Sequence, residues 1–418
     1  MNTDKICPLF GLCGGCRYDG SSYSNELTRK EEQLKQLFLP VLGKDFFMSP
    51  AYEGMLESPV DKGYRNKMEF SFGNQEKDGP LTLGLHQKKS FFNILPVEDC
   101  RIVHPDLNRI TAGVQAFFRR EGVSFYHKKS HQGLLRHLVL RRSWSRGDIL
   151  VNLVTAAGFS EELGRAFTEM LLSLPLKGRI SGILHTENNS LSDAVVPERV
   201  RLLWGKGELS ERLLGLEFKI SPFSFFQNNT PGAELLYAKA RDYISLTPGA
   251  VVYDLYSGTG TIAQMLAPAA RRVYGVEIVE EAVEAAWENA AQNGLDNCVF
   301  LAGDVLKTLE ELPEKVDYII LDPPAFTKSS ATVDSARRGY REINRRAMQL
   351  LPRGGYLATC SCSHFMTPDL FTRMLREAAA DAAVTLRQIE DRRQAPDHPI
   401  LWGVPETEYL KFYLFQVV

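Results

Sequence analysis

From about residue 245 onward, short apolar runs alternate with segments of helical periodicity. The runs are VVYDLYSG, RRVYGVEI, CVFLAGDV, VDYIILDPP, GGYLATCSCS and EYLKFYLFQVV. Between the second and third runs, apolar residues recur at helical spacing from Val279 to Ala290, and Gly294 follows as a stop signal. Strand-like runs that alternate with helices predict an α/β domain with a doubly wound, mainly parallel sheet.

The preceding region has a mixed pattern. Polar and apolar residues alternate in LRHLVLRRSW and DILVNLVTA, which predicts strands that are half exposed to solvent. Pro59 and the segment KISPFSFFQNNTPG mark breaks in the pattern. We therefore predict three parts: an N-terminal segment over 1–60, a central α+β domain over 61–220 and the α/β domain over 221–418.

The composition is that of a globular protein. Of 418 residues, 44% are hydrophobic and 24% charged, which excludes disordered, fibrous and small disulfide-rich classes. No run reaches the roughly 18 apolar residues of a membrane span, and MNTDKICPLFG lacks the order of a signal peptide, so we expect a cytoplasmic protein without a membrane partner. Since 49 basic residues balance 51 acidic ones, a nucleic-acid partner requires a local basic patch.

Seven cysteines fall into clusters, and their odd number argues against a disulfide framework. Cys7, Cys13 and Cys16 form C-x5-C-x2-C with two glycines before the third, and Cys100 lies in ILPVEDCRIVHP. Four thiolates suit a four-iron cluster or a structural zinc ion. Three close cysteines with one distant cysteine favour the 4Fe-4S cluster, and the glycines permit tight wrapping around it. Unliganded buried cysteines are the remaining alternative.

A glycine-rich turn follows the first apolar run. In DLYSGTGT, Gly258 and Gly260 let the backbone approach a bound ligand. Glu277 ends the next strand, where a carboxylate can accept ribose hydroxyls, and Asp304 ends the third, within reach of an adenine amino group. Each acid alone could instead cap a helix or end a solvated loop. Together they favour an adenosine-containing ligand, and a nicotinamide dinucleotide is the competing prediction because G-x-G-x-x-A is also present.

The fourth and fifth runs end in chemically reactive groups. LDPPAF places Asp322 and two rigid prolines at the carboxyl edge of the sheet, a turn typical of S-adenosylmethionine enzymes that act on nitrogen or on nucleic-acid bases. The fifth run ends in Cys360-Ser-Cys362-Ser, which puts a thiol in the same crevice. A buried structural cysteine is the ordinary alternative. We expect Cys360 to face the opposite side of the strand, which leaves Cys362 as the nucleophile.

A thiol at this position suits methylation of a pyrimidine. Carbon 5 of the ring is too weakly nucleophilic to attack a methyl sulfonium directly, but addition of a thiolate to carbon 6 makes carbon 5 an enolate or enamine carbon. A base must then remove the proton from carbon 5. Glu408, in ETEYLKFYLF, is the first candidate and Glu406 the second, although either could be an exposed strand-end charge.

Together these motifs resemble the RNA 5-methyluridine methyltransferases that carry an iron-sulfur cluster. The cysteine array, GYRNKMEFSF, SPFSFFQNN, DLYSGTGT, GVEI, GD, DPP and SCS occur in that family's order over nearly the whole chain. The resemblance implies a seven-stranded, Rossmann-like class I methyltransferase domain that methylates a uridine of 23S ribosomal RNA with S-adenosylmethionine. It implies a cluster held by the four cysteines named above, Cys362 as nucleophile and Glu408 as base. The positions that match the family's methyl-donor contacts are Gln227, Tyr256, Thr261, Glu277, Asp304 and Asp322.

Two features depart from that family. The segments after the prolines, and DHPILWGVPETEYLK, are more similar to 5-methylcytidine methyltransferases of ribosomal RNA, and Ala325-Phe326 and Ser363 replace the usual Arg and Asn. The cysteine chemistry serves both bases, so uridine is favoured with cytidine, or a tRNA substrate, as alternatives. Because the cluster motif starts at residue 7, we expect no β-barrel RNA-binding domain before it, and we expect a monomer. A catalytically idle RNA-binding factor is the alternative from another class, and Cys362 with Asp322 argues against it.

Basic residues in two regions are candidate RNA contacts. Those of the central domain and those beside the active site are Lys128, Lys129, Arg136, Arg141, Arg142, Arg146, Lys328, Arg337, Arg338, Arg341, Arg345 and Arg346. Arg338, Arg341 and Arg345 share one face of a predicted helix, with Tyr340 near enough to stack on a base. A solvated charged helix is the alternative.

Overall fold

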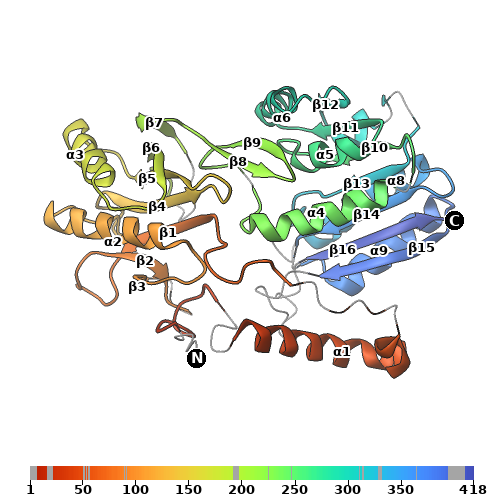
Figure 1. The fold of residues 1–418 in the computed structure, drawn as a ribbon, viewed down its shortest axis with the longest axis horizontal. Coiled ribbons are helices and arrows are strands. Elements are labelled where there is room, and N and C mark those ends of the chain that lie inside the picture. Colours follow the sequence, from red (N-terminus) through yellow and green to blue (C-terminus); the bar gives the residue numbers. More distant parts are fainter. Residues whose placement is uncertain are drawn as a thin grey trace. The chain divides into compact units, whose positions relative to one another are not determined.

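A computed structural model describes most of the chain as two compact units (Figure 1). The first unit comprises Met1–Arg212 and Lys219–Ala233, and the second comprises Leu213–Phe218 and Glu234–Val418. The described residues are 7–16, 22–49, 52, 54, 57–88, 90, 92–191, 197–224, 226–245, 247–309, 311–312, 315–327, 332–363, 365–393 and 410–418. A two-stranded sheet is formed by β8 (Leu209–Leu213) and β9 (Leu216–Ile220).

The first unit is built on a seven-stranded sheet with the order β3-β2-β1-β4-β5-β6-β7. Its strands are β1 (Lys67–Gly73), β2 (Thr82–His86), β3 (Ile94–Pro96), β4 (Leu135–Arg142), β5 (Asp148–Thr155), β6 (Arg179–Glu187) and β7 (Arg199–Gly205). Neighbouring strands are antiparallel except β5 and β6, which are parallel because α3 (Glu161–Leu172) provides a crossover between them. α3 and α2 (Pro105–Arg120) pack on the sheet through Phe70, Leu107, Phe118, Leu140 and Phe167, and α1 (Tyr23–Met48) precedes the sheet in the chain.

The expectation that β4 and β5 are half exposed is wrong. Seven of eight residues in each strand are buried, although several are polar. The polar residues are satisfied inside the protein: Arg136 donates to the carbonyl oxygen of Asn188 at 2.8 Å, and Arg141 donates to those of Pro222 and Ser224. Polar alternation therefore marks an internally hydrogen-bonded face here rather than a solvated one.

The second unit confirms the predicted α/β class. Its seven-stranded sheet has the order β12-β11-β10-β13-β14-β16-β15, with β16 antiparallel to both neighbours and the other pairs parallel. The strands are β10 (Val251–Leu255), β11 (Arg272–Glu277), β12 (Cys298–Ala302), β13 (Tyr318–Leu321), β14 (Tyr356–Ser361), β15 (Leu386–Arg393) and β16 (Lys411–Val417). The six predicted apolar runs all contain strands. The seventh strand, β15, was missed because its sequence LRQIEDRR is mostly charged and polar.

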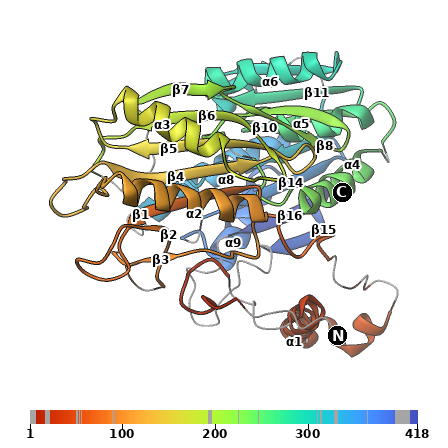
Figure 2. The same cartoon turned by 60° about the vertical axis from the view of Figure 1, so that its left-hand side comes forward.

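Helices cover both faces of this sheet (Figures 1 and 2). The helical elements of the second half are α4 (Thr230–Ser245), α5 (Thr261–Leu266), η1 (Ala267–Ala269), α6 (Glu280–Gln292), α7 (Val305–Thr308), α8 (Val333–Leu350) and α9 (Pro368–Asp381). α5 and α6 share one buried cluster with Val252 and Phe300, whereas α8 and α9 share another with Leu321 and Leu357. The predicted helix after β11 is α6, which ends before Gly294 in the left-handed conformation. Across the described helices, none combines the length and apolar character of a membrane span.

Candidate active site and cysteine pocket

The turn after β10 is held in an unusual backbone conformation. Tyr256, Gly258 and Gly260 have φ angles of 65°, 55° and 71°, a region that side chains other than glycine rarely adopt. A Cβ atom on Gly260 would lie 2.5 Å from Cε1 of Phe300, so this glycine permits close packing on the sheet. A Cβ atom on Gly258 would have no heavy atom within 4 Å. Gly258 therefore borders open space that a ligand can approach.

Two of the predicted ligand-binding acids hold the backbone of this edge. The carboxylate of Glu277 accepts hydrogen bonds from the backbone N–H of Gly258 at 3.0 Å and of Ile278 at 2.8 Å, which fastens the end of β11 to the glycine turn. Asp304 accepts from the backbone N–H of Lys307 at 3.2 Å and caps α7. One carboxylate oxygen of Asp304 therefore acts as a helix cap, which was the alternative role for this acid. Both acids lie at the carboxyl ends of adjacent parallel strands.

A third acid, Asp254, is buried beneath the turn. It is 1% exposed and accepts a hydrogen bond from the backbone N–H of Ala263 at 2.9 Å, which ties β10 to α5. Burial raises the pKa of Asp254 to about 7, the bond from Ala263 opposes the rise, and the charges of Asp322 and Glu277 add to it. The ends of β10, β11 and β13 thus bring three carboxyl groups close enough to influence one another.

The two cysteines at the end of β14 differ sharply in environment. The thiol of Cys360 is buried and donates to Oδ1 of Asp322 at 3.1 Å and to the carbonyl oxygen of Leu321 at 3.4 Å. Burial, followed by the charge of Asp322, raises the pKa of Cys360 well above its usual value, which keeps the group a thiol. Cys362, one residue beyond the strand, is exposed.

Strand alternation does not put these cysteines on opposite sides as expected, because residues two apart on a strand share a side and Cys362 lies beyond the end of β14. The charge of Asp322 acts on both thiols. For Cys362, desolvation by neighbouring atoms and then Asp322 raise the thiol pKa, whereas Lys411 and the backbone N–H groups of Cys362 and Ala325 lower it. Exposure separates the pair: Cys362 can meet a substrate, and Cys360 is enclosed.

The remaining predicted site residues are placed as follows. Thr261 begins α5, directly after Gly260. Gln227 belongs to the first unit, where its carbonyl oxygen accepts from Nδ2 of Asn66 at 2.7 Å. The two candidate bases, Glu406 and Glu408, lie outside the described residues. Sequence reasoning missed Lys411, a buried lysine in the apolar run KFYLFQV, although its alternation with buried Tyr413 and Phe415 was a signal.

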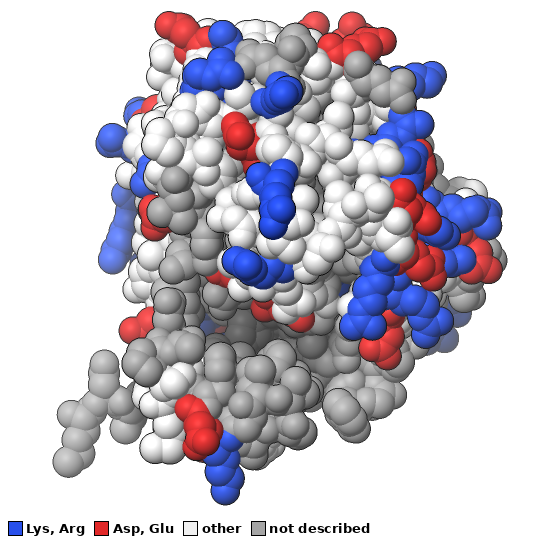
Figure 3. Space-filling view, turned by 90° about the vertical axis from the view of Figure 1, so that its right-hand side faces the viewer, with Lys and Arg blue, Asp and Glu red and all other residues white. Residues whose placement is uncertain are grey.

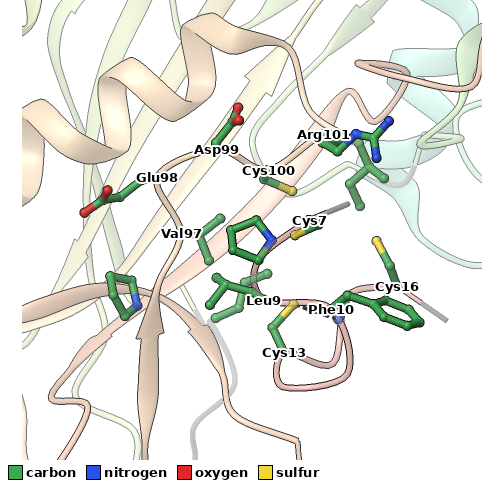
Figure 4. A pocket seen from close by; sticks show the side chains of 15 residues that line it. Cys7, Leu9, Phe10, Cys13, Cys16, Val97, Glu98, Asp99, Cys100 and Arg101 are labelled. Carbon is green, nitrogen blue, oxygen red and sulfur yellow. Dashed lines mark hydrogen bonds between the residues drawn. The ribbon is translucent and has the colours of Figure 1, made fainter. Parts of the chain in front are cut away.

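The first unit gathers the four predicted ligand cysteines around one cavity of about 310 Å³ (Figure 4). Cys7, Cys13 and Cys16 come from the N-terminal turn, and Cys100 comes from the segment between β3 and α2. Their sulfur atoms turn toward one region of the cavity in Figure 4. The rest of the lining is largely apolar and includes Leu9, Phe10, Leu85, Pro96, Val97 and Ile102.

The donor set of this cavity fits an iron-sulfur cluster. Burial and then the charges of Cys13 and Cys7 raise the pKa of the Cys100 thiol overall, and the backbone N–H groups of Ile102 and Val103 oppose this rise. The backbone N–H of Gly15 also points to Sγ of Cys13 at 3.4 Å. Such N–H···S bonds favour thiolates, the form that ligates iron. Among the described residues, no three His, Cys, Asp or Glu side chains converge on a single metal ion, so the fit rests on the four thiols that line the cavity.

Comparison with known proteins places the chain in a family. A family model described as a methyltransferase domain matches residues 246–402. An uncharacterized RNA methyltransferase of Clostridium tetani is 44% identical over 318 residues, which are 76% of this chain and 69% of that protein. Another, from Caldanaerobacter subterraneus subsp. tengcongensis, is 43% identical over 324 residues, 78% of this chain and 71% of that protein. The chain belongs to the RNA methyltransferase family.

A solved structure shares the fold of this RNA methyltransferase. It is the tRNA (uracil-54, C5)-methyltransferase of Pyrococcus abyssi in complex with S-adenosyl-L-homocysteine, with a TM-score of 0.66 and 24% identity over 99% of this chain and 86% of that chain. Membership in the family and the methyltransferase domain identify S-adenosylmethionine as the methyl donor and RNA as the acceptor. The nicotinamide alternative is therefore wrong.

Several arginines predicted to contact RNA instead support the fold of the first unit. Arg136 and Arg141 are buried and bind backbone carbonyls, as described above. Arg142 lies 4.0 Å from the buried Asp106. Lys129 and Arg146 are exposed and stay candidates for RNA contact.

The arginines of α8 are engaged in ion pairs. Arg337 lies 3.0 Å from Glu377 and Arg341 lies 2.6 Å from Asp381, so both join α8 to α9. Arg345 and Arg346 both bind Glu342 on their own helix. Figure 3 likewise shows basic and acidic side chains intermixed on one face of the molecule.

Tyr340 cannot stack on a base as expected. Its ring is fully buried and packs at 4.5 Å from that of Phe326 and at 5.7 Å from that of Phe371. Arg338 is exposed and stays a candidate for RNA contact, and Lys328 lies outside the described residues. The charged surface of α8 therefore corresponds mainly to the solvated, ion-paired alternative.

Proposed function

We propose that this RNA methyltransferase methylates carbon 5 of a uridine in 23S ribosomal RNA through a covalent adduct with Cys362. The observation that carries the proposal is the exposed thiol of Cys362 at the carboxyl edge of the methyltransferase sheet, beside the hydrogen-bonded pair of Asp322 and Cys360. Parallel sheets bind their ligands at this edge. A pyrimidine above it would meet both the thiol and a methyl donor held at the glycine turn.

The chemistry follows from the residues of this edge. The thiolate of Cys362 adds to carbon 6 of the ring, the electron pair of the 5,6 double bond moves toward the carbonyl at carbon 4, and carbon 5 takes the methyl group as the sulfonium becomes a thioether. Glu408 then removes the proton from carbon 5. The electron pair of that C–H bond restores the double bond, and the bond from carbon 6 to sulfur breaks to release the thiolate of Cys362.

Uridine is the first choice of base because the motif order resembles 5-methyluridine enzymes and because the structurally similar archaeal protein is described as a uracil-C5 methyltransferase of tRNA. One observation favours cytidine as the second candidate. Desolvation of the Asp322 carboxyl group raises its pKa, while the bond from Cys360 lowers it. A protonated carboxyl group would donate to N3 of cytosine, which is an acceptor, whereas a carboxylate would accept from the N3–H of uracil.

The other site residues have supporting roles in this proposal. The methyl donor is held at Gln227, Tyr256, Gly258, Gly260, Thr261, Glu277, Asp304 and Asp322. Cys7, Cys13, Cys16 and Cys100 would hold a 4Fe-4S cluster, which would supply a rigid crosslink between the N-terminal turn and the segment after β3. In domain terms, residues 1–60 with Cys100 form the cluster segment, 61–220 the RNA-binding domain and 221–418 the methyltransferase domain.

Nucleoside mass spectrometry tests the proposal directly. Unmodified 23S ribosomal RNA transcript is incubated with the protein and isotopically labelled S-adenosylmethionine, and the digested RNA is expected to contain labelled 5-methyluridine. Labelled 5-methylcytidine would assign the activity to the second candidate. Absence of label in 23S ribosomal RNA and in tRNA would contradict both and favour a non-catalytic RNA-binding factor.

Two variants test the residue roles in the same assay. Cys362→Ala should abolish labelling while RNA binding persists. Cys298→Ala, which removes a buried thiol at the start of β12, should retain labelling. Glu408→Gln should accumulate a covalent complex of protein and RNA that resists denaturing electrophoresis, because the adduct forms but cannot be resolved. Labelling by Cys362→Ala at the wild-type rate would refute the covalent mechanism.

A further inference from the structure

The first residue of β16 is a lysine buried beside the reactive thiol. Lys411 is 0% exposed and pairs in register with Ser361 on β14. Its Nζ donates to the carbonyl oxygen of Ser363 at 2.6 Å, so the ammonium group reaches the residue that follows Cys362. Lysine is rarely buried completely, because removing its charge from water is costly unless an anion in the same region compensates.

The lysine belongs to a small polar cluster that fixes the thiol segment. The hydroxyl of Ser363 donates to the carbonyl oxygen of Thr327 at 3.1 Å, and Ser363 and Thr327 are both almost fully buried. Lys411 thus fastens the segment directly after β14, which contains Cys362, and Ser363 fastens this segment in turn to the DPPAFT segment. Hydrogen bonding alone would explain a polar side chain at this position, but it would not require a charged one.

The electrostatic surroundings of Cys362 explain the charge. Among the described residues, the titratable groups that interact with this thiol are Asp322 after β13, Cys360 on β14, Tyr340 on α8 and Lys411 on β16. Asp322 opposes formation of the thiolate and Lys411 favours it. Burial holds the pKa values of Cys360 and Tyr340 above their usual range, so both are neutral near pH 7. Lys411 therefore offsets a carboxylate that would otherwise suppress the nucleophile.

We propose that Lys411 is a positioning residue that holds Cys362 at the sheet edge and stabilises its thiolate. The proposal rests on the function proposed above, in which the thiolate of Cys362 adds to the pyrimidine. It gives the charge of Lys411 a role that the covalent mechanism alone does not require.

The test is the pH dependence of alkylation at Cys362, read by peptide-resolved mass spectrometry after brief exposure to iodoacetamide between pH 6 and pH 10. Lys411→Gln keeps a donor for the carbonyl of Ser363 but removes the charge. Its alkylation midpoint should rise by about one pH unit, which lowers the rate at pH 7 about tenfold, and the plateau at high pH should be unchanged. Lys411→Arg keeps the charge and should restore most of the shift.

A matched control is Lys315→Met, which removes an exposed charge near the start of β13. This position lies at the amino-terminal ends of the parallel strands, whereas Cys362 lies at their carboxyl ends. Lys315→Met should leave the Cys362 profile unchanged. Lys411→Met is a second variant that removes both charge and donor, and alkylation of the buried Cys298 in the same spectra would reveal unfolding of either variant. A wild-type profile in folded Lys411→Gln would overturn the proposal, because hydrogen bonding alone would then account for the lysine.

This experiment is independent of turnover. It uses the full chain without RNA, so its outcome does not depend on which base is methylated. If the alkylation midpoint shifts and no pyrimidine methylation is found, the electrostatic role stands and the proposed function fails. If methylation is found and the midpoint does not shift, only the inference about Lys411 fails.

Discussion

Two glycines in the turn after β10 should respond differently to the same substitution. Gly258 and Gly260 both have positive φ, so alanine at either position is strained by about 1–2 kcal/mol. Only at Gly260 does the added Cβ also meet neighbouring side chains, at 2.5 Å from Cε1 of Phe300 on β12 and 2.9 Å from Cβ of Ala286 on α6. Overpacking of this kind costs about 1–3 kcal/mol more. We therefore expect losses of about 2–5 kcal/mol for Gly260→Ala and about 1–2 kcal/mol for Gly258→Ala.

The chain contains a suitable probe of this corner. The indole N–H of Trp287 donates to the carbonyl oxygen of Phe300 at 3.1 Å, and the two rings lie 5.6 Å apart. With the other three of the four tryptophans replaced by phenylalanine, fluorescence during urea unfolding reports on the residue that Gly260→Ala displaces. With a slope of about 2 kcal/mol per molar urea, the unfolding midpoints of the two variants should differ by about 0.5–1.5 M.

Ligand binding should show the opposite order of effects. The Cβ of Gly258→Ala would enter the open space before the turn, so we expect S-adenosylmethionine affinity, measured by calorimetry, to fall at least about tenfold, or about 1.4 kcal/mol. Equal unfolding midpoints for the two variants would refute the packing argument. Unchanged S-adenosylmethionine affinity in Gly258→Ala would refute the placement of the donor at this turn.

Two further predictions concern the first unit. Protein purified without oxygen should contain about four irons per chain. Cys100→Ser should lose most of this iron, whereas Cys298→Ser, which changes a cysteine outside the pocket, should retain it. Zinc in place of iron would contradict the cluster. Asp106 is fully buried and accepts hydrogen bonds from the backbone N–H groups of Lys177 and Gly178. Burial raises its pKa, but these bonds and nearby cationic groups outweigh burial, so the pKa lies below the ordinary value of 3.8. The stabilisation from Asp106 is therefore complete above about pH 4 and is lost as pH falls through the lowered pKa. Asp106→Asn should lower the free energy of unfolding, measured in urea, by about 2–4 kcal/mol at pH 7 and by progressively less below pH 4. A loss that is independent of pH would contradict this assignment.

The sequence identified the strands of the second unit because parallel strands buried on both faces are nearly continuous apolar runs. It missed β15, an edge strand rich in charge, because apolar periodicity is weak where only one side needs burial. It also misjudged β4 and β5 in the first unit. Their polar residues bind backbone carbonyls from distant segments such as Asn188 and Pro222, and local alternation contains no information about such partners.

The candidate site shows the same division between local and distant information. The order of motifs placed Gly258, Glu277 and Asp322 at one edge because strand ends in a parallel sheet must meet there. Motif order could not show that Asp322 accepts a hydrogen bond from Cys360, since that contact depends on the pairing of β13 with β14.

The choice between the two thiols illustrates what motifs leave undecided. Cys360 and Cys362 have similar local sequences, yet one is a buried donor to Asp322 and the other is exposed beyond the strand end. Desolvation raises the pKa of Asp322 and the hydrogen bond from Cys360 lowers it, whereas burial and the charge of Asp322 raise the pKa of the Cys360 thiol. As the acceptor of the hydrogen bond from Cys360, Asp322 presents a carboxylate that suits the N3–H donor of uracil, whereas the N3 acceptor of cytosine would need a protonated carboxyl group. Base preference in this enzyme should therefore follow the partner of Asp322 rather than the nucleophile itself.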